Sequence, residues 1–167
     1  MIARTALAFG LLAFAAADAM AAQVAEMGQF KDWSAYTYKV DGKSECYAIS
    51  WPSAKWPANL NHGDVSFFVT ATERSPSRTE VSFQTGYEFA QGSKVIASIG
   101  EDTFTMFTDG KGAWLRRTER EPAFLEALRS GSEMAISATS ARGNDTSYVF
   151  SLDGVTAATR RILSRCP

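Results

Sequence analysis

Histidine is almost absent from this sequence: His62 is the only one among 167 residues. A serine-hydrolase triad would have to use it, yet no G-x-S-x-G pattern is present to hold a nucleophile. A zinc site would need further clustered histidine or cysteine ligands. No glycine pattern joins a predicted strand to a predicted helix, so a phosphate-binding loop is not indicated. We therefore expect His62 on the surface and predict no catalytic residue, no metal and no cofactor.

Cysteine is also scarce, with only Cys46 and Cys166. Two cysteines are too few for a structural metal site, and a reactive thiol would need an activating neighbour. In an oxidising compartment an isolated pair is most simply one disulfide bond. The bond would join an early strand to the end of the chain, and the chain-entropy model gives loops of such length about 4.7 kcal/mol before native strain is subtracted.

The sequence carries little net charge, −1 at pH 7, so nucleic acid is not predicted as a partner. One long apolar run, at 6–17, follows a single cation, Arg4, and precedes small residues at 19–21. This pattern is typical of a cleaved secretion signal; a membrane anchor is the alternative, but the run is short for a span of about 20 residues. We predict a signal peptide over 1–21 and one mature domain over 22–167, periplasmic or secreted, with no transmembrane segment after cleavage.

The stretch 81–115 indicates the fold. Short apolar runs at 81–83, 95–99 and 104–107 are separated by glycine-containing breaks, and Trp114 opens a fourth run. Such spacing is typical of an antiparallel meander. In the third run apolar residues alternate with threonines, so one face can be buried while the other is exposed.

Segments on both sides of this stretch complete the prediction. Residues 23–29 are expected to form a mobile lead, and 51–63, with two Trp-Pro pairs, a long connection. One short helix is expected to start at Pro122 and to end at Gly131, and a C-terminal helix over 153–165 has Ser151 or Asp153 as its N-cap. Further strands are predicted at 33–40, 46–51, 65–72, 134–138 and 148–152. The fold class is therefore all-β, an antiparallel β-sandwich or barrel-like meander with one short internal helix and a C-terminal helix.

Two groups of residues are candidate contacts with a partner. Trp51 and Trp56 each precede a proline in the predicted connection, where they could present rigid aromatic surface, as binding hot spots often do. The alternative is that both indoles fold over an open end of the sheet. Arg116, Arg117 and Arg120 form a cationic cluster, and ordinary solvated surface is the alternative interpretation of it.

Two further functions are open from the residues alone. Glu101, Asp102 and Asp109 flank the predicted strand at 104–107 and could serve a hydrolase as paired carboxylates, although acids at strand ends are more often turn residues. A small-ligand carrier would instead need an apolar cavity inside the sheet.

Three segments are more specific to a protein family than the overall composition is. They are the strand that begins at Trp33 and leads to Cys46, the sequence LRSG at 128–131 after the small helix, and FSLDG at 150–154 before the last helix. With these segments the chain resembles the invasion-associated locus B family of exported bacterial proteins over roughly 33–162. It differs from many members in lacking a cysteine pair near the middle of the domain.

The resemblance implies an all-β periplasmic or envelope-associated protein, of a family linked in some pathogens with entry into host cells. It supplies no established catalytic residues to carry over. The function expected from it is that of an exported, non-enzymatic protein that acts through contacts with an envelope or host-surface protein.

Overall fold

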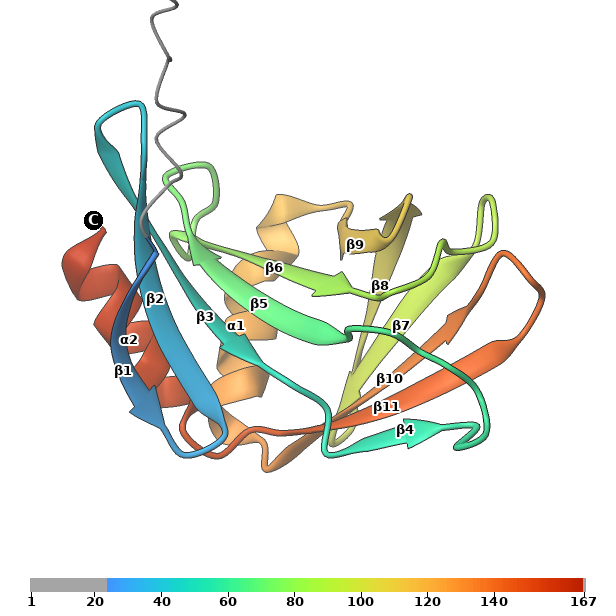
Figure 1. Cartoon of the computed structure of the whole chain (residues 1–167). Helices are drawn as coiled ribbons and strands as arrows, with labels where there is room; N and C mark the ends of the chain where they lie inside the picture. Colours follow the sequence, from blue (N-terminus) through green and yellow to red (C-terminus); the bar gives the residue numbers. More distant parts are fainter. Residues whose placement is uncertain (1–23, 167) are drawn as a thin grey trace, which may run out of the picture.

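The computed structural model describes residues 24–166, so the predicted signal peptide over 1–21 lies outside the described residues. Its strands form one 11-stranded antiparallel sheet in the order β1-β2-β3-β5-β6-β9-β8-β7-β10-β11-β4. The sheet curves into an open trough and does not close into a barrel (Figure 1). The strands are β1 (Ala25–Phe30), β2 (Trp33–Val40), β3 (Lys43–Ser50), β4 (Ala54–Trp56), β5 (Ser66–Ala71), β6 (Thr79–Gln84), β7 (Lys94–Ile99), β8 (Asp102–Asp109), β9 (Gly112–Leu115), β10 (Glu133–Thr139) and β11 (Asp145–Ser151).

The helices are those that the sequence predicts. A 3-10 turn, η1 (Thr118–Arg120), leads into α1 (Glu121–Ser130), and α2 (Val155–Arg165) ends the described chain. Pro122 lies in the first turn of α1, where its missing N–H has no intrahelical acceptor to lose. The predicted class, all-β with one internal and one C-terminal helix, is confirmed.

Two strands lie where the sequence indicates none. β1 occupies the segment expected to be a mobile lead and pairs with β2. β4 lies inside the expected connection and pairs with β11. Both are edge strands of the sheet, and an edge strand needs a partner on one side only, which weakens its sequence signal.

The central strands depart from a simple meander because β9 lies between β6 and β8. β7, β8 and β9 are joined by tight turns in which Gly100 and Gly110 have φ of 57° and 56°, a conformation that glycine adopts without strain. β6 then pairs with β9 rather than with β7. Turn residues predict the local hairpins, but the pairing of β6 with β9 joins segments distant in sequence.

The inner face of the sheet is filled by aromatic side chains. Trp33, Phe67, Phe83 and Phe150 are fully buried, and Phe124 of α1 stacks on Phe104 of β8 with ring centroids 4.3 Å apart. Together these rings fill the space where a carrier would hold its ligand.

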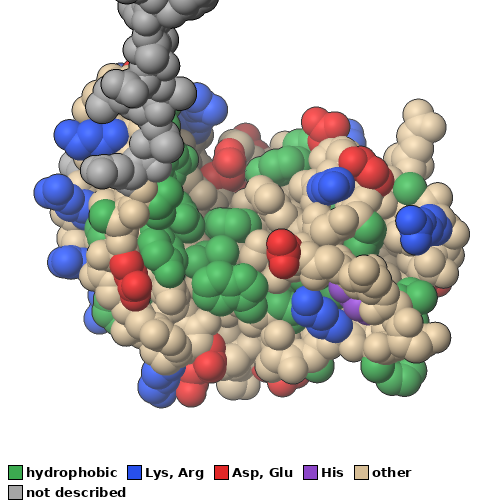
Figure 2. Space-filling model, viewed as in Figure 1, with side chains coloured by type: hydrophobic (Ala, Val, Ile, Leu, Met, Phe, Trp, Pro, Cys, Tyr) green, Lys and Arg blue, Asp and Glu red, His purple; other side chains and the backbone are tan. Residues whose placement is uncertain are grey.

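The outer face carries a smaller aromatic cluster. Tyr47 contacts Tyr36, Tyr38 and Phe68, with ring centroids 5.5, 5.9 and 5.7 Å away. Figure 2 shows hydrophobic side chains gathered over this part of the sheet, formed by β2, β3 and β5.

The predicted disulfide is present. Cys46 of β3 and Cys166 are bonded, with Cα atoms 5.8 Å apart, and the bond holds the end of α2 against the sheet. The predicted side-chain N-cap of α2 is wrong, because Gly154 holds the N-cap position with φ of 99° and no side-chain cap. A Cβ there would lie 1.7 Å from the carbonyl oxygen of Phe30, so close packing against the turn after β1 selects glycine at this position.

Candidate functional site

The candidate site lies where β9 ends. β9 pairs with 106–109 of β8 on one side and with 82–84 of β6 on the other. After Leu115 the chain turns away into η1, so 79–81 of β6 and 102–105 of β8 each have a strand neighbour on one side only. The end of β9 therefore leaves two strand edges facing each other.

On the β8 side, the hairpin geometry fixes the direction of the backbone groups. Ile99 and Asp102 flank a two-residue turn and exchange backbone hydrogen bonds, and in an antiparallel pair such bonds recur at every second residue. Phe104 therefore bonds to β7, whereas Thr103 and Thr105 direct their N–H and C=O groups toward the space beyond Leu115. No strand among the described residues occupies that space.

On the β6 side, a side chain closes the edge. The backbone N–H of Val81 donates to both carboxylate oxygens of Glu121, each 3.2 Å away. Glu121 is the first residue of α1 and is only 1% exposed. Burial raises its pKa to about 7; the hydrogen bond from Val81 lowers the pKa, and the nearby Glu80 raises it further.

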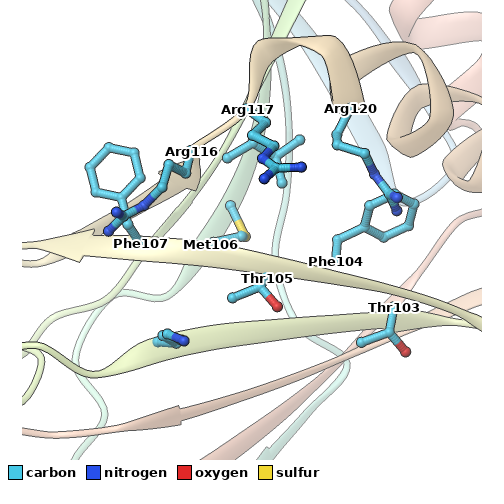
Figure 3. A pocket seen from close by; sticks show the side chains of 10 residues that line it. Thr103, Phe104, Thr105, Met106, Phe107, Arg116, Arg117 and Arg120 are labelled. Atoms are coloured by element: carbon cyan, nitrogen blue, oxygen red, sulfur yellow. The ribbon is translucent and has the colours of Figure 1, made fainter.

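The β8 edge faces a cavity of about 480 Å³. We call this cavity the arginine pocket. Five consecutive residues of β8, 103–107, form one wall, and Leu115 with the segment after it forms the other. Figure 3 shows side chains from that segment extending toward β8. The cations at the pocket are Lys94, Arg116, Arg117 and Arg120.

The arginine pocket combines positive charge with an apolar floor. Phe104 and Met106 are buried, and the guanidinium of Arg120 lies 5.1 Å from the centre of the Phe104 ring, a cation–π contact that positions this arginine. No carboxylate belongs to the pocket lining, and among residues 24–166 none of its cations takes part in a salt bridge. The arrangement suits an anionic group attached to an apolar or backbone portion.

The structure thus brings together the arginines that the sequence singled out, but not the tryptophans. Trp51 and Trp56 are 52% and 66% exposed and do not cover the end of the sheet. Trp56 belongs to β4, and three strands separate β4 from β8. Sequence reasoning missed Lys94, Thr103 and Thr105, because only the pairing of β8 with β7 and β9 places them beside the arginines.

The acids considered for a hydrolase do not form a site. Glu101 and Asp102 lie at the start of β8 and Asp109 at its end, all exposed. Along an eight-residue strand the two ends are about 24 Å apart, too far for paired carboxylates. Within the described part of the chain no three His, Cys, Asp or Glu side chains converge as metal ligands either.

The expectation of a surface histidine is wrong. His62 is 6% exposed, with Nδ1 2.9 Å from the hydroxyl of Tyr148 and Nε2 2.9 Å from the carbonyl oxygen of Pro57. Burial raises the pKa of Tyr148, which also contacts the hydroxyl of Tyr87 at 2.9 Å. The loop after β4 folds back over β11, so His62 ties that loop to the sheet.

Comparison with known proteins agrees with this architecture. The family model described as invasion associated locus B (IalB) protein matches residues 33–163. The chain belongs to the IalB family. The crystal structure of invasion associated protein b from Bartonella henselae shares the fold, with a TM-score of 0.62 and 15% sequence identity over 83% of this chain and 95% of that chain. No curated protein matches this sequence.

The IalB match extends over both edges left by β9 and every residue of the arginine pocket. At 15% identity, the likeness to the Bartonella protein shows the fold alone. None of the helices within residues 24–166 has the length and apolar character needed to cross a membrane.

Proposed function

We propose that this IalB-family protein is an exported, non-enzymatic binding protein of the bacterial envelope and that the arginine pocket is its binding site. The partner is an envelope or host-surface protein that presents acidic groups. One observation carries this proposal: Lys94, Arg116, Arg117 and Arg120 gather around a buried apolar floor with no carboxylate in the pocket lining.

The physical reason is the cost of gathering like charges. Cations that are close together repel one another, and the repulsion is stronger beside an apolar wall than in bulk water. Arginine is suited to relieve that repulsion by binding a carboxylate with two parallel hydrogen bonds. An acidic partner therefore gains both charge pairing and contact with Phe104 and Met106.

A crosslinking pull-down from the native envelope tests the proposal. The pocket variant is Arg116→Ala/Arg117→Ala, and the matched control is Arg160→Ala/Arg165→Ala, which removes the same charge from exposed positions of α2. We expect one envelope partner to be recovered with wild type and control but lost with the pocket variant, at unchanged melting temperature. Equal recovery with all three proteins would exclude the pocket as the contact.

Export rests on the family and on the N-terminal pattern. The chain belongs to a family of exported bacterial proteins, and its N-terminal pattern predicts a signal peptide over 1–21. The Cys46–Cys166 disulfide is of the kind that persists in oxidising compartments. Mass spectrometry of the mature protein is expected to give Ala22 as its first residue. A mature chain that retains residues 1–21 would contradict cleavage.

Trp51 and Trp56 form a second candidate contact. Their exposure makes them available to a partner, and large exposed aromatic side chains are enriched at binding hot spots. Because they lie across the sheet from the arginine pocket, they would contact a different part of the same partner.

A further inference from the structure

We infer that the arginine pocket takes an extended acidic peptide, which adds to the free edge of β8 as a short strand. The inference rests on the proposed function, because it names the partner segment for the same site. The added strand would continue the line of β9 beyond Leu115, between β8 and the segment that carries Arg116, Arg117 and Arg120.

The backbone of β8 supplies the first part of the case. By the alternation set by its two hairpins, Thr103 and Thr105 direct their N–H and C=O groups into the pocket. These are the groups that an added strand needs, and main-chain pairing of this kind is a recurrent way of binding peptides. The same sheet already contains a pairing as short as three residues, between β4 and β11.

The position of the cations supplies the second part. The guanidinium of Arg120 lies over the ring of Phe104, which is buried on the inner face of β8. Arg116 is drawn in Figure 3 toward the end of β8 that carries Phe107, whose side chain is exposed. Successive side chains of an added strand point to opposite faces. Acidic residues on either face would therefore meet a guanidinium.

The same charges argue against a second copy of this chain as the occupant. Positively charged residues at a strand edge are a common protection against pairing with identical molecules. A second copy docked through the same edge would bring its own Lys94 and arginines against these. The charge pattern thus excludes the protein itself and selects an acidic segment.

A synthetic peptide tests the inference on the mature chain. The probe is an acetylated and amidated hexapeptide of alternating glutamate and valine, compared with two versions N-methylated at its odd or its even residues. We expect the parent peptide to bind, to slow amide hydrogen exchange at Thr103 and Thr105, and to lose at least about tenfold in affinity in one N-methylated version.

Variants of the protein test the same backbone contact by changing β8 instead of the peptide. Thr105→Pro removes the edge-facing N–H, and proline is tolerated at such positions of an edge strand because no ladder bond is lost. Thr105→Val keeps the N–H and replaces only the hydroxyl with a methyl group. We expect the proline variant to bind the hexapeptide at least about tenfold more weakly than the valine variant.

The outcomes separate this inference from the proposed function. If both N-methylated peptides bind as tightly as the parent, while Arg116→Ala/Arg117→Ala abolishes binding, the contact is charge alone; strand addition is then wrong and the proposed function stands. The same holds if inorganic polyphosphate binds and the peptide does not, or if the envelope partner is captured but no peptide binds. If the wild-type protein neither captures an envelope partner nor binds the peptide, both the strand-addition inference and the proposed function are wrong.

Discussion

The two strand edges exposed where β9 ends differ in how they are completed. On β6, the N–H of Val81 is satisfied by the carboxylate of Glu121, which is buried. On β8, Thr103 and Thr105 face a cavity with four cations around it. The first edge is closed by a residue of the chain itself, whereas the second has no strand neighbour among residues 24–166 and is where we propose that an acidic molecule binds. The proposed binding site is thus the edge at which the chain itself supplies no hydrogen-bonding partner.

Closing the β6 edge has an electrostatic cost. Glu121 sits in the first turn of α1, where the helix dipole favours a negative charge, and Val81 donates a hydrogen bond to it. Even so, burial dominates and raises the pKa of Glu121 to about 7. The open edge avoids the cost of burying a charge, because its charged groups remain in contact with solvent.

The largest expected effect concerns the pH dependence of the closed edge. Because the pKa of Glu121 is raised in the folded protein to about 7, the native state binds more protons than the unfolded state between about pH 4.5 and pH 7. Stability is therefore expected to fall as pH rises through that window, by about 3 kcal/mol, since a tenfold change in proton affinity corresponds to about 1.4 kcal/mol. Urea denaturation from pH 4 to pH 8 measures it.

The control for this prediction is Glu121→Gln. The amide still offers an oxygen to the N–H of Val81 but does not titrate in this range. The fall in stability should disappear in the variant, and an unchanged fall would assign it to another group.

A second prediction compares removal of the two edges' side chains. At pH 5, Glu121→Ala leaves the buried N–H of Val81 without an acceptor and is expected to destabilise the protein by about 2 kcal/mol. Thr105→Ala at the open edge changes an exposed side chain and should cost less than about 0.5 kcal/mol. Chemical denaturation of both variants decides the point, and equal losses would mean that the edges do not differ.

A third prediction concerns the charges of the open edge. Arg116→Ala/Arg117→Ala should leave stability within about 0.5 kcal/mol but weaken binding of the acidic hexapeptide at least about tenfold, since hydrogen bonds to charged groups contribute about 1.5–3 kcal/mol. Calorimetric titration of the variant and of Arg160→Ala/Arg165→Ala gives the comparison. Weakening of wild-type binding by added salt is also expected, because exposed charges are screened.

The smallest expected effect is that of Trp51→Ala/Trp56→Ala on peptide binding. Trp56 lies in β4 and Trp51 just before it, and three strands separate β4 from β8. Hexapeptide affinity should therefore be unchanged while capture of the envelope partner falls. Reduced peptide affinity would show that the two surfaces are coupled, and undiminished capture would remove the tryptophans from the contact.

Much of the local structure could be predicted from the sequence. Glycines at tight turns marked the β7–β8 and β8–β9 hairpins, Pro122 and Gly131 bounded the internal helix, and the cysteine pair predicted the disulfide. Arg116, Arg117 and Arg120 were recognised as a group because they are close in the chain.

The opposite wall of the pocket could not be predicted, because it depends on pairing between distant segments. Thr103 and Thr105 become free only because β9 is shorter than β8 and inserts beside β6. Glu121 was not singled out in the sequence; it is buried, and its carboxylate accepts a hydrogen bond from the N–H of Val81, 40 residues away. The prediction of a surface position for His62 was wrong for a similar reason, since its partner Tyr148 is 86 residues away.

Amide hydrogen exchange at Val81, Thr103 and Thr105 tests the difference between the edges most directly. In the free protein we predict slow exchange at Val81 and fast exchange at Thr103 and Thr105, with both threonine amides slowing when the acidic hexapeptide is added. Slow exchange at the threonines in the free protein would mean that the β8 edge is already closed, and would contradict the account.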